Sequence, residues 1–505
     1  MDDHSGKNRD IIIGAANGRH VKQLLKMSNR HGLIAGATGT GKTITLQILA
    51  EGFSQAGVPV FTSDIKGDLS GMGMAGKANP KITERLNLIK LPEFEFQPAA
   101  VEYWDVFGKK GQPIRATVSE MGPLLLASLL ELNDTQTGIL YACFKIADDD
   151  GLLLLDLKDL RAMLSWVSQH AKELRNDYGN ISSSSIGAIQ RKLLVLEQQG
   201  ADKFFAEPAL ELEDLLKTDE DGFGKINILD ATRLSAQSPR LYATFLLWLL
   251  SELFEELPEV GNADKPKLVF FFDEAHLLFK DTPKSLVNKI EQVVRLIRSK
   301  GVGIFFITQS PMDIPNAILG QLGMKIQHTL RAFTPKDRKA IKLVAETFRP
   351  NEHFSTAEML TQLATGEALV SVLDNKGRPT AVEKTLICPP QSKMGPISAK
   401  MRKQYMLMSE LAGKYQQTID RESAYEILHA RAEKKAELAE KNAQKLELEK
   451  QQQQEYKRAN KKTSRSSSRR QTAGEAFMKS TLRSIGSSFG RRLVRGLLGS
   501  LLSGR

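Results

Sequence analysis

The chain has 505 residues, of which 41% are apolar, a composition that suits a globular core and about two to three domains. Only two cysteines are present, Cys143 and Cys388, which excludes a disulfide framework and predicts a cytoplasmic protein. The polar N-terminus is unlike a signal peptide, and the most apolar long run, Leu241–Leu250, is too short to span a bilayer.

The net charge of +11 is distributed unevenly along the chain. The last 50 residues, Tyr456–Arg505, contain 13 Lys and Arg residues and one acidic residue, so they carry +12 and the rest of the chain carries −1. A basic tail predicts an anionic partner, either nucleic acid or a membrane surface. A disordered segment that only keeps the protein soluble is the alternative.

The first predicted elements surround a phosphate-binding loop. The sequence GATGTGKT fits the G-x-x-x-x-G-K-[ST] pattern; a short apolar strand, Leu33–Ala35, precedes it, and Ile44 and Ile48 follow at helical spacing. Glycines let backbone N–H groups approach the phosphates, and the positive end of the helix points at the same anion. We therefore expect ATP to be bound by Gly36, Ala37, Thr38, Gly39, Thr40, Gly41, Lys42 and Thr43.

Two residues of this loop have individual roles. Lys42 places a point charge near the β- and γ-phosphates, and the hydroxyl group of Thr43 is a ligand for Mg²⁺. The next strand, Val58–Phe61, leads into a polar loop with Asp64 and Lys66. Such a loop belongs to the ligand crevice of an open α/β sheet, so both side chains can reach nucleotide or metal. For either residue alone, an ordinary capped turn is the better interpretation.

Residues 94–225 have a different pattern. Ile114–Val118 is predicted to be a strand, and four amphipathic helical segments follow. Asp134 caps the second of these helices and Asp156 caps the third, while Gly200 ends the fourth. We interpret this region as a mainly helical insertion in the nucleotide-binding domain.

A second diagnostic motif is LVFFFDEAH at residues 268–276. A buried strand delivers two adjacent carboxylates to its carboxyl end, where Asp273 holds hydrated Mg²⁺ and Glu274 polarises the attacking water. The following core strand, Gly303–Gln309, places the amide of Gln309 beside them. This amide either senses the γ-phosphate and orients water, or is an ordinary hydrogen-bonding group at a strand end.

The last part of the predicted sheet consists of strands near residues 325–330 and 367–372, and Asn375–Gly377 indicates a hairpin. Beyond residue 390 the composition shifts. A capping box at Ser423–Glu426 opens a long, solvated, charged helix to about Arg458. A Ser/Arg-rich segment follows, and a final leucine stripe with adjacent arginines predicts a basic amphipathic helix.

Together these motifs resemble the HerA-like branch of the HerA–FtsK group of P-loop ATPases, and most of all a bacterial branch with a single module. The resemblance covers about residues 10–390, and its matching parts are Arg30–Thr43, Asp64–Gly71, Asp273–Glu274, Arg295–Gly301 and Ile307–Pro311. It implies an α/β, RecA-like P-loop NTPase core, a hexameric ring and ATP-driven movement of DNA. HerA proteins also carry an N-terminal β-barrel, which we do not expect here because only 35 residues precede Gly36.

The resemblance also divides the chain and names two arginines. Ring ATPases stabilise charge at the γ-phosphate with an arginine of the neighbouring subunit. Arg298 fits that role and Arg30 fits an arginine close to the nucleotide, with surface salt bridges as the alternative for both. The predicted segments are 1–93 (first part of the ATPase core), 94–225 (helical insertion), 226–390 (second part of the core), 391–458 (charged helix) and 459–505 (basic tail).

Superfamily 2 helicases share similar phosphate-loop and Asp-Glu motifs, but they need a second RecA-like domain. Only 117 residues separate Asp273 from Pro390, and these complete the first sheet. We therefore expect a cytoplasmic, ATP- and Mg²⁺-dependent ring motor, a homo-oligomer acting on DNA. The alternative is an ATPase that remodels or docks to a protein or membrane partner, with the basic C-terminal helix as its contact.

Overall fold

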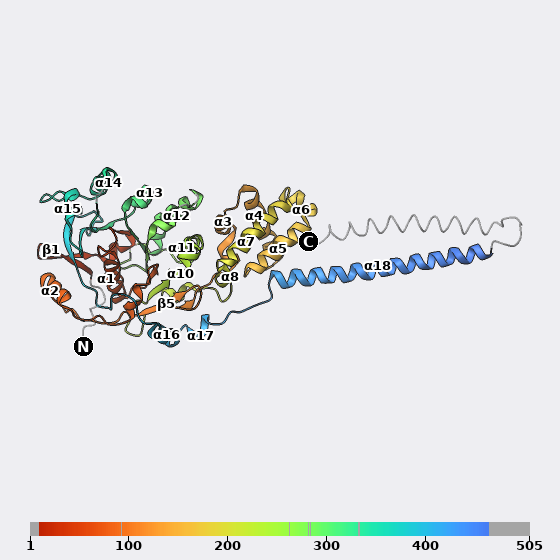
Figure 1. Ribbon diagram of the computed structural model, residues 1–505, viewed down its shortest axis with the longest axis horizontal. Helices are drawn as coiled ribbons and strands as arrows, with labels where there is room; N and C mark the ends of the chain where they lie inside the picture. Colours follow the sequence, from red (N-terminus) through yellow and green to blue (C-terminus); the bar gives the residue numbers. More distant parts are fainter. Residues whose placement is uncertain are drawn as a thin grey trace. The chain divides into compact units, whose positions relative to one another are not determined.

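The computed structural model describes residues 10–463, except 92, 262, 281, 283, 332 and 333. The chain divides into two compact units after His429 (Figure 1). The first unit holds the sheet and the helices packed on it. The second begins inside the long helix α18 (Ala424–Thr463). The division into five segments remains a prediction from the sequence.

One 12-stranded sheet organises the first unit, in the order β2-β1-β12-β11-β10-β3-β9-β8-β4-β7-β5-β6. From β10 to β6 neighbouring strands are parallel, whereas β11, β12, β1 and β2 extend one edge in antiparallel pairs. The predicted α/β class is confirmed. The strands are β1 (Ile11–Ala16), β2 (Arg19–Gln23), β3 (Gly32–Ala35), β4 (Val60–Asp64), β5 (Val101–Asp105), β6 (Gln112–Pro113), β7 (Ile226–Asp230), β8 (Leu268–Phe272), β9 (Val302–Thr308), β10 (Met324–Gln327), β11 (Glu367–Ser371) and β12 (Glu383–Ile387).

Both faces of the central parallel strands are buried, which explains their continuous apolar sequences. In β8, Phe270 and Phe272 pack into the core shared with the insertion helices, while Val269 and Phe271 pack on the other side with α1. The helices that precede β7 are α1 (Lys42–Gln55), α2 (Pro80–Ile89), α3 (Val118–Leu129), α4 (Asp134–Asp149), α5 (Leu157–Gln169), α6 (Ala171–Tyr178), α7 (Ser183–Gln198), α8 (Ala201–Phe204) and α9 (Leu212–Leu215).

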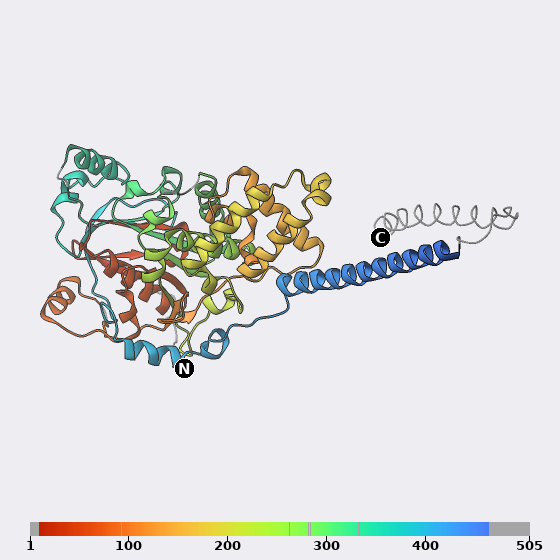
Figure 2. The same cartoon turned by 45° about the vertical axis from the view of Figure 1, so that its right-hand side comes forward.

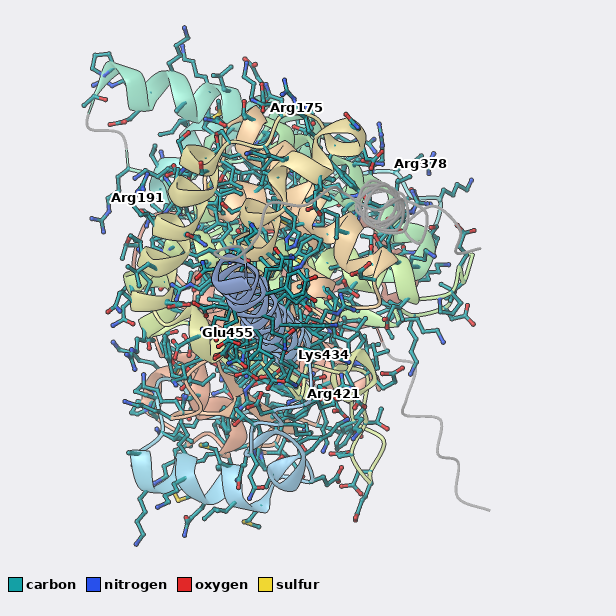
Figure 3. All side chains as sticks on the ribbon, turned by 90° about the vertical axis from the view of Figure 1, so that its right-hand side faces the viewer. Arg175, Arg191, Arg378, Arg421, Lys434 and Glu455 are labelled. Atoms are coloured by element: carbon teal, nitrogen blue, oxygen red, sulfur yellow. The ribbon has the colours of Figure 1, made fainter. Side chains whose placement is uncertain are left out.

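Helices α3 to α7 gather into one bundle beside the sheet (Figure 2). Two of the three predicted helix boundaries are confirmed: Asp156 caps α5, and Gly200, with φ 93°, follows the end of α7. The N-cap of α4 is Asn133, not Asp134, because its side chain accepts the N–H of Gln136. Exposed side chains such as Arg175 on α6 and Arg191 on α7 project outward from this bundle (Figure 3).

The interval that the sequence predicts to be mainly helical also contains two strands. The interval 94–225 contributes β5 and β6 to the edge of the sheet. The predicted strand at Ile114–Val118 is wrong. All five residues are buried, but among the described residues the backbone makes only one isolated bridge, to Phe205. The alternating apolar pattern reflects packing on the helical bundle rather than pairing in a ladder.

The remaining helices are α10 (Thr232–Gln237), α11 (Pro239–Glu256), α12 (Lys284–Leu296), α13 (Asn316–Leu319), α14 (Pro335–Glu346), α15 (Thr356–Gln362), α16 (Ala399–Met408) and α17 (Ala412–Tyr415), with α18 last. The predicted hairpin is confirmed, since β11 and β12 pair around the turn at Asp374–Arg378. Within the described residues, no helix has the length and apolar character needed to cross a bilayer.

Helix α18 begins as the sequence predicts. The N–H of Ser423 donates to Glu426 at 3.0 Å, and the hydroxyl group of Ser423 bonds to Asp159 of α5. From residue 431 to 457 the side chains of α18 are exposed all round, and Lys434 and Glu455 project from it in Figure 3. The Ser/Arg-rich segment and the terminal amphipathic helix lie outside the described residues.

Candidate nucleotide site

The phosphate loop joins the end of β3 to the start of α1, as the motif predicts. Its backbone is anchored on both sides: Gly36 donates to Thr308 at 3.3 Å, and Ala37 donates to Thr329 at 3.0 Å. Gly41 has a φ of 120°, which favours glycine. A Cβ at Gly36 would lie 2.5 Å from the Cβ of His328. Glycine is therefore required there for close approach.

His328 packs against Gly36 and Gly41 of the phosphate loop. One ring nitrogen lies 2.9 Å from the hydroxyl group of Thr45 and the other 3.0 Å from the carbonyl of Glu367. Burial lowers the pKa of His328 to about 4, so the ring is neutral near pH 7. The sequence contains no signal for this contact, which spans 283 positions between Thr45 and His328.

Lys42 folds over the loop that precedes it. Its ammonium group donates to the carbonyls of Gly36 at 2.6 Å and Ala37 at 3.1 Å. Burial and the nearby charge of Lys66 lower the pKa of Lys42, and Glu274 and Asp273 oppose that shift. The ammonium therefore lies within electrostatic reach of both carboxylates, as expected for a phosphate-binding lysine.

The two carboxylates stand at the carboxyl end of β8, and both are buried. Burial raises the pKa of Asp273 to about 7, which Lys66 partly offsets. Glu274 adopts a left-handed backbone conformation with φ 46°. Such conformations cost about 1–3 kcal/mol and persist where the surrounding structure imposes them, often at functional sites.

Glu274 is the most heavily contacted member of the site. One carboxylate oxygen lies 2.7 Å from the ammonium group of Lys66. The other lies 3.5 Å from the amide nitrogen of Gln309 and 3.3 Å from Nδ1 of His276. Burial acts to raise the pKa of Glu274, but Lys66, together with His276 and Lys42, outweighs burial and lowers it. Glu274 is therefore ionised near pH 7.

In the loop after β4, the two candidate residues, Asp64 and Lys66, make different contacts. The carboxylate of Asp64 accepts the backbone N–H groups of Gly67 at 2.7 Å, Asp68 at 3.2 Å and Leu69 at 3.0 Å. Asp64 is therefore the cap of an ordinary turn, whereas Lys66 reaches Glu274. Burial raises the pKa of Asp64 to about 6.

The oxygen ligands near the loop fit Mg²⁺. Among the described residues no cluster of three or more His, Cys, Asp or Glu could hold a metal by itself. Mg²⁺ typically binds one or two protein oxygens and the phosphates of the nucleotide, and keeps several waters. Among the described residues, only the N–H of Glu274 donates a hydrogen bond to the buried carboxylate of Asp273. This carboxylate and the hydroxyl group of Thr43 would hold the ion. The side chain of Asp68 forms a hydrogen bond with the side chain of Thr43.

Arg30 and Arg298 lie away from this site. They precede β3 and β9, whose carboxyl ends bear the phosphate loop and Gln309. Because β3 and β9 are parallel and in register, both arginines lie at the opposite edge of the sheet. Four residues of strand separate the edges by roughly 13 Å. The structure therefore does not bring Arg30 or Arg298 to the nucleotide site of its own chain.

The two arginines are close to each other instead. Burial and the nearby charge of Arg30 lower the pKa of the exposed Arg298, and no carboxylate of the described residues acts on it. The guanidinium of Arg30 lies against the turn at Gly377. His31 holds this edge together, with one ring nitrogen 2.8 Å from the carbonyl of Val294 and the other accepting the N–H of Ile304 at 3.0 Å.

The site thus brings together Lys42, Asp273, Glu274 and Gln309, as their motifs predict. It also contains Lys66 as the partner of Glu274, and His276 and His328, for which the sequence pattern predicts no role. His276 stands within the Asp-Glu motif, so its position was visible, whereas the pairing of Lys66 with Glu274 depends on β4 lying next to β8.

The sequence is similar to that of a known protein family and of proteins from two archaea. A profile of the family described as Helicase HerA-like C-terminal matches residues 10–505. The chain is 21% identical over 382 residues to the DNA double-strand break repair helicase HerA of Sulfolobus acidocaldarius, covering 72% of this chain and 66% of that protein. For the HerA of Saccharolobus solfataricus the identity is 23% over 369 residues, covering 71% and 65%. The chain therefore spans just under two thirds of the length of these relatives.

Among solved structures, the fold is similar to the plasmid coupling protein TrwB in complex with the non-hydrolysable ATP analogue ADPNP. The identity is 16% and the TM-score 0.48, with 79% of this chain and 95% of that chain covered. The structural likeness is limited. The match to the family profile confirms the HerA-like resemblance and the P-loop ATPase class.

Proposed function

Because the chain belongs to the HerA-like helicase C-terminal family, we propose that it hydrolyses ATP with Mg²⁺ and uses the energy as a ring-shaped motor on DNA. The observation that carries the hydrolysis is the convergence of Lys42, Asp273, Glu274 and Gln309 at the carboxyl edge of one sheet. Nucleotide-binding crevices lie at this edge in open α/β folds.

The chain's own residues divide the work of hydrolysis. The loop N–H groups and Lys42 bind the phosphates, and Gln309 and Glu274 orient a water. The water oxygen bonds to the γ-phosphorus, and the bond from phosphorus to the bridging oxygen breaks, leaving its electron pair on ADP. The proton of the water passes to Glu274 and then to solvent. Asp273 and Thr43 would hold Mg²⁺, which would neutralise part of the charge of the phosphates.

The position of Arg298, away from the nucleotide site of its own chain, supports a ring. Of the described arginines, Arg298 is exposed and without a carboxylate partner, at the edge of the sheet that its own nucleotide does not reach. In a ring of equivalent subunits, that edge faces the next subunit's nucleotide, where an arginine stabilises the transition state. We place Arg30 beside Arg298 in the same contact.

The motor acts on DNA in this proposal, and the basic tail supplies a sequence-independent attraction. A tail with +12 charges binds polyanions through counterion release. The alternative is an ATPase that docks to a protein or membrane partner, favoured by the leucine stripe between Leu493 and Leu502, which phosphates do not need. A cytoplasmic location agrees with Cys143 and Cys388, both free thiols.

Steady-state hydrolysis tests the proposal directly. We expect Mg²⁺-dependent ATPase activity that double-stranded or single-stranded DNA stimulates. Glu274→Gln keeps the shape but removes the base, so it should retain ATP binding and lower kcat about 10²- to 10⁴-fold. Lys42→Ala should weaken nucleotide binding instead. A Glu274→Gln protein that hydrolyses ATP at the parental rate would show that the catalytic assignment is wrong.

A further inference from the structure

Lys66 is presented to the nucleotide site by a fixed turn. Asp64 accepts three successive backbone N–H groups of the loop, at Gly67, Asp68 and Leu69. Since β4 and β8 are parallel neighbours, with Thr62 opposite Phe271, the residues after each strand meet. Lys66 is therefore held beside Glu274 by backbone geometry, and only its side chain is free to move.

Lys66 forms an ion pair with Glu274, the proposed catalytic base. The Lys66 ammonium lies 2.7 Å from one oxygen of Glu274, while Gln309 and His276 contact the other. The Lys66 contact is the shortest of the three, so the ammonium competes most directly with an attacking water for the carboxylate. The Lys66 side chain is 40% exposed and that of Glu274 is 7% exposed, so the lysine is the partner that can leave.

Lys66 also stands close to the phosphate-binding lysine. Its charge acts on Lys42 strongly enough to lower the pKa of that residue, although burial is the larger cause. Two ammonium groups therefore surround the position that the motif gives to the terminal phosphates. A phosphate group carries about −1.5 to −2 charge near neutral pH, more than the single charge of Glu274, and competes for the same ammonium.

We propose that Lys66 is a second catalytic lysine, which contacts the γ-phosphate of ATP and thereby releases Glu274 to polarise the water. This inference rests on the proposed function. With ADP there is no γ-phosphate, and Lys66 stays on Glu274. The exchange links the arrival of the correct nucleotide to the freeing of the base, so that Glu274 acts only when ATP is in place.

An ion pair similar to that of Lys66 and Glu274 lies at the carboxyl end of β7, the strand next to β4. The ammonium of Lys110 lies 3.3 Å from Asp230, with the lysine 51% exposed and the carboxylate 4% exposed. Asp230 also pairs with Arg402 at 2.8 Å, and neither cation contacts Glu274. Lys110→Met therefore removes a similar pair at the same edge of the sheet without touching the base.

Nucleotide binding distinguishes the proposal from a static role. The full-length chain and its Lys66→Met, Lys66→Arg and Lys110→Met variants are titrated with ADP and with a non-hydrolysable imido analogue of ATP, both with Mg²⁺. Lys66→Met should weaken analogue binding about 10- to 100-fold, the value of one charge-assisted hydrogen bond. Its ADP affinity should stay within about twofold, its kcat should fall, and Lys66→Arg should recover part of the analogue affinity. Lys110→Met should change neither affinity.

Equal effects of Lys66→Met on ADP and on the analogue would overturn the inference, even with a lower kcat, because Lys66 would then only neutralise Glu274. Lys66→Gln gives the same comparison if the methionine variant does not fold, as judged by thermal unfolding. Wild-type protein that binds neither nucleotide would overturn the proposed function itself. Wild-type protein that hydrolyses ATP, with variants that bind the analogue normally, would overturn only the role of Lys66.

Discussion

The carboxyl and amino ends of the central parallel strands carry different charged groups. At the carboxyl edge, the phosphate loop, Glu274 and Gln309 come together, with two buried carboxylates and two lysines. At the amino edge, Arg30 and Arg298 lie together with no carboxylate of the described residues acting on Arg298. In the proposed ring, the carboxyl edge of one chain binds the nucleotide, and Arg298 of the neighbouring chain completes the site.

Each edge has its own buried histidine. His328 supports the phosphate loop, and His31 joins the start of β3 to α12 and β9. Both rings are neutral, because burial lowers the pKa of each to about 4. The same residue type therefore fixes the loop at one edge and the arginine-bearing segment at the other.

The largest effect is expected at the amino edge. Arg298→Ala should lower kcat about 10³-fold or more, the size found for arginine fingers, while leaving nucleotide affinity nearly unchanged. Arg295→Ala is the matched control, since Arg295 is also exposed and lies in the last turn of α12. Steady-state ATPase rates with protein in its assembled form give the comparison. Equal losses in the two variants would remove the distinction between the two arginines.

The histidines predict a pH-dependent stability. A pKa of about 4 in the folded state lies below the ordinary value of 6.5, so the unfolded chain binds the proton first. Each histidine therefore destabilises the fold as the pH falls from about 6.5 toward 4, by up to about 1.4 kcal/mol per pH unit. His31→Gln should remove that dependence, and His328→Gln should do the same at the other edge.

Chemical denaturation at several pH values measures this effect as a difference between each variant and the parent. The difference is needed because Asp64 and Asp273, whose pKa values burial raises to about 6 and about 7, shift stability in the opposite direction. A free energy of unfolding with the same pH slope in His31→Gln and the parent would show that His31 is not held neutral.

The smallest effect on hydrolysis is expected from the tail. Removing residues 456–505 should leave the ATPase rate without DNA unchanged but abolish the salt-sensitive share of DNA binding, because the deleted segment carries +12. Removing only residues 491–505 should keep most DNA affinity and lose attachment to liposomes or to an apolar partner. Unchanged DNA affinity and salt slope in the larger deletion would assign the DNA contact to the motor itself.

Sequence alone predicted the parts of the site that are local in the chain. The phosphate loop, the Asp273–Glu274 pair and Gln309 each follow a buried strand, and a strand followed by a polar turn is visible as a pattern. Lys66 was visible as a candidate, but its role depends on the parallel pairing of β4 with β8. His31 and His328 act through contacts that span 273 and 283 positions, which no local pattern encodes.

The wrong prediction in the fold has a related cause. Ile114–Val118 alternates as a strand does, and its apolar residues are buried, but its backbone groups bond to separate partners, Ala116 to Phe204 and Arg115 to Leu210. The sequence pattern therefore predicted the burial of this segment correctly, but not the absence of strand pairing. Strand β5 was missed because Glu102 and Asp105 interrupt its apolar pattern, although both are buried at the edge of the sheet.

Mixing two inactive variants tests the joining of the two edges most directly. Arg298→Ala lacks the arginine and Glu274→Gln lacks the base, so each alone should be nearly inactive. If the site forms between subunits, mixed rings contain some interfaces with an intact Glu274 and an intact Arg298, and the mixture should recover part of the ATPase rate. The recovered rate should depend on the mixing ratio and peak near equal amounts. A mixture no more active than its components, or a monomer in solution that hydrolyses ATP at full rate, would contradict the account.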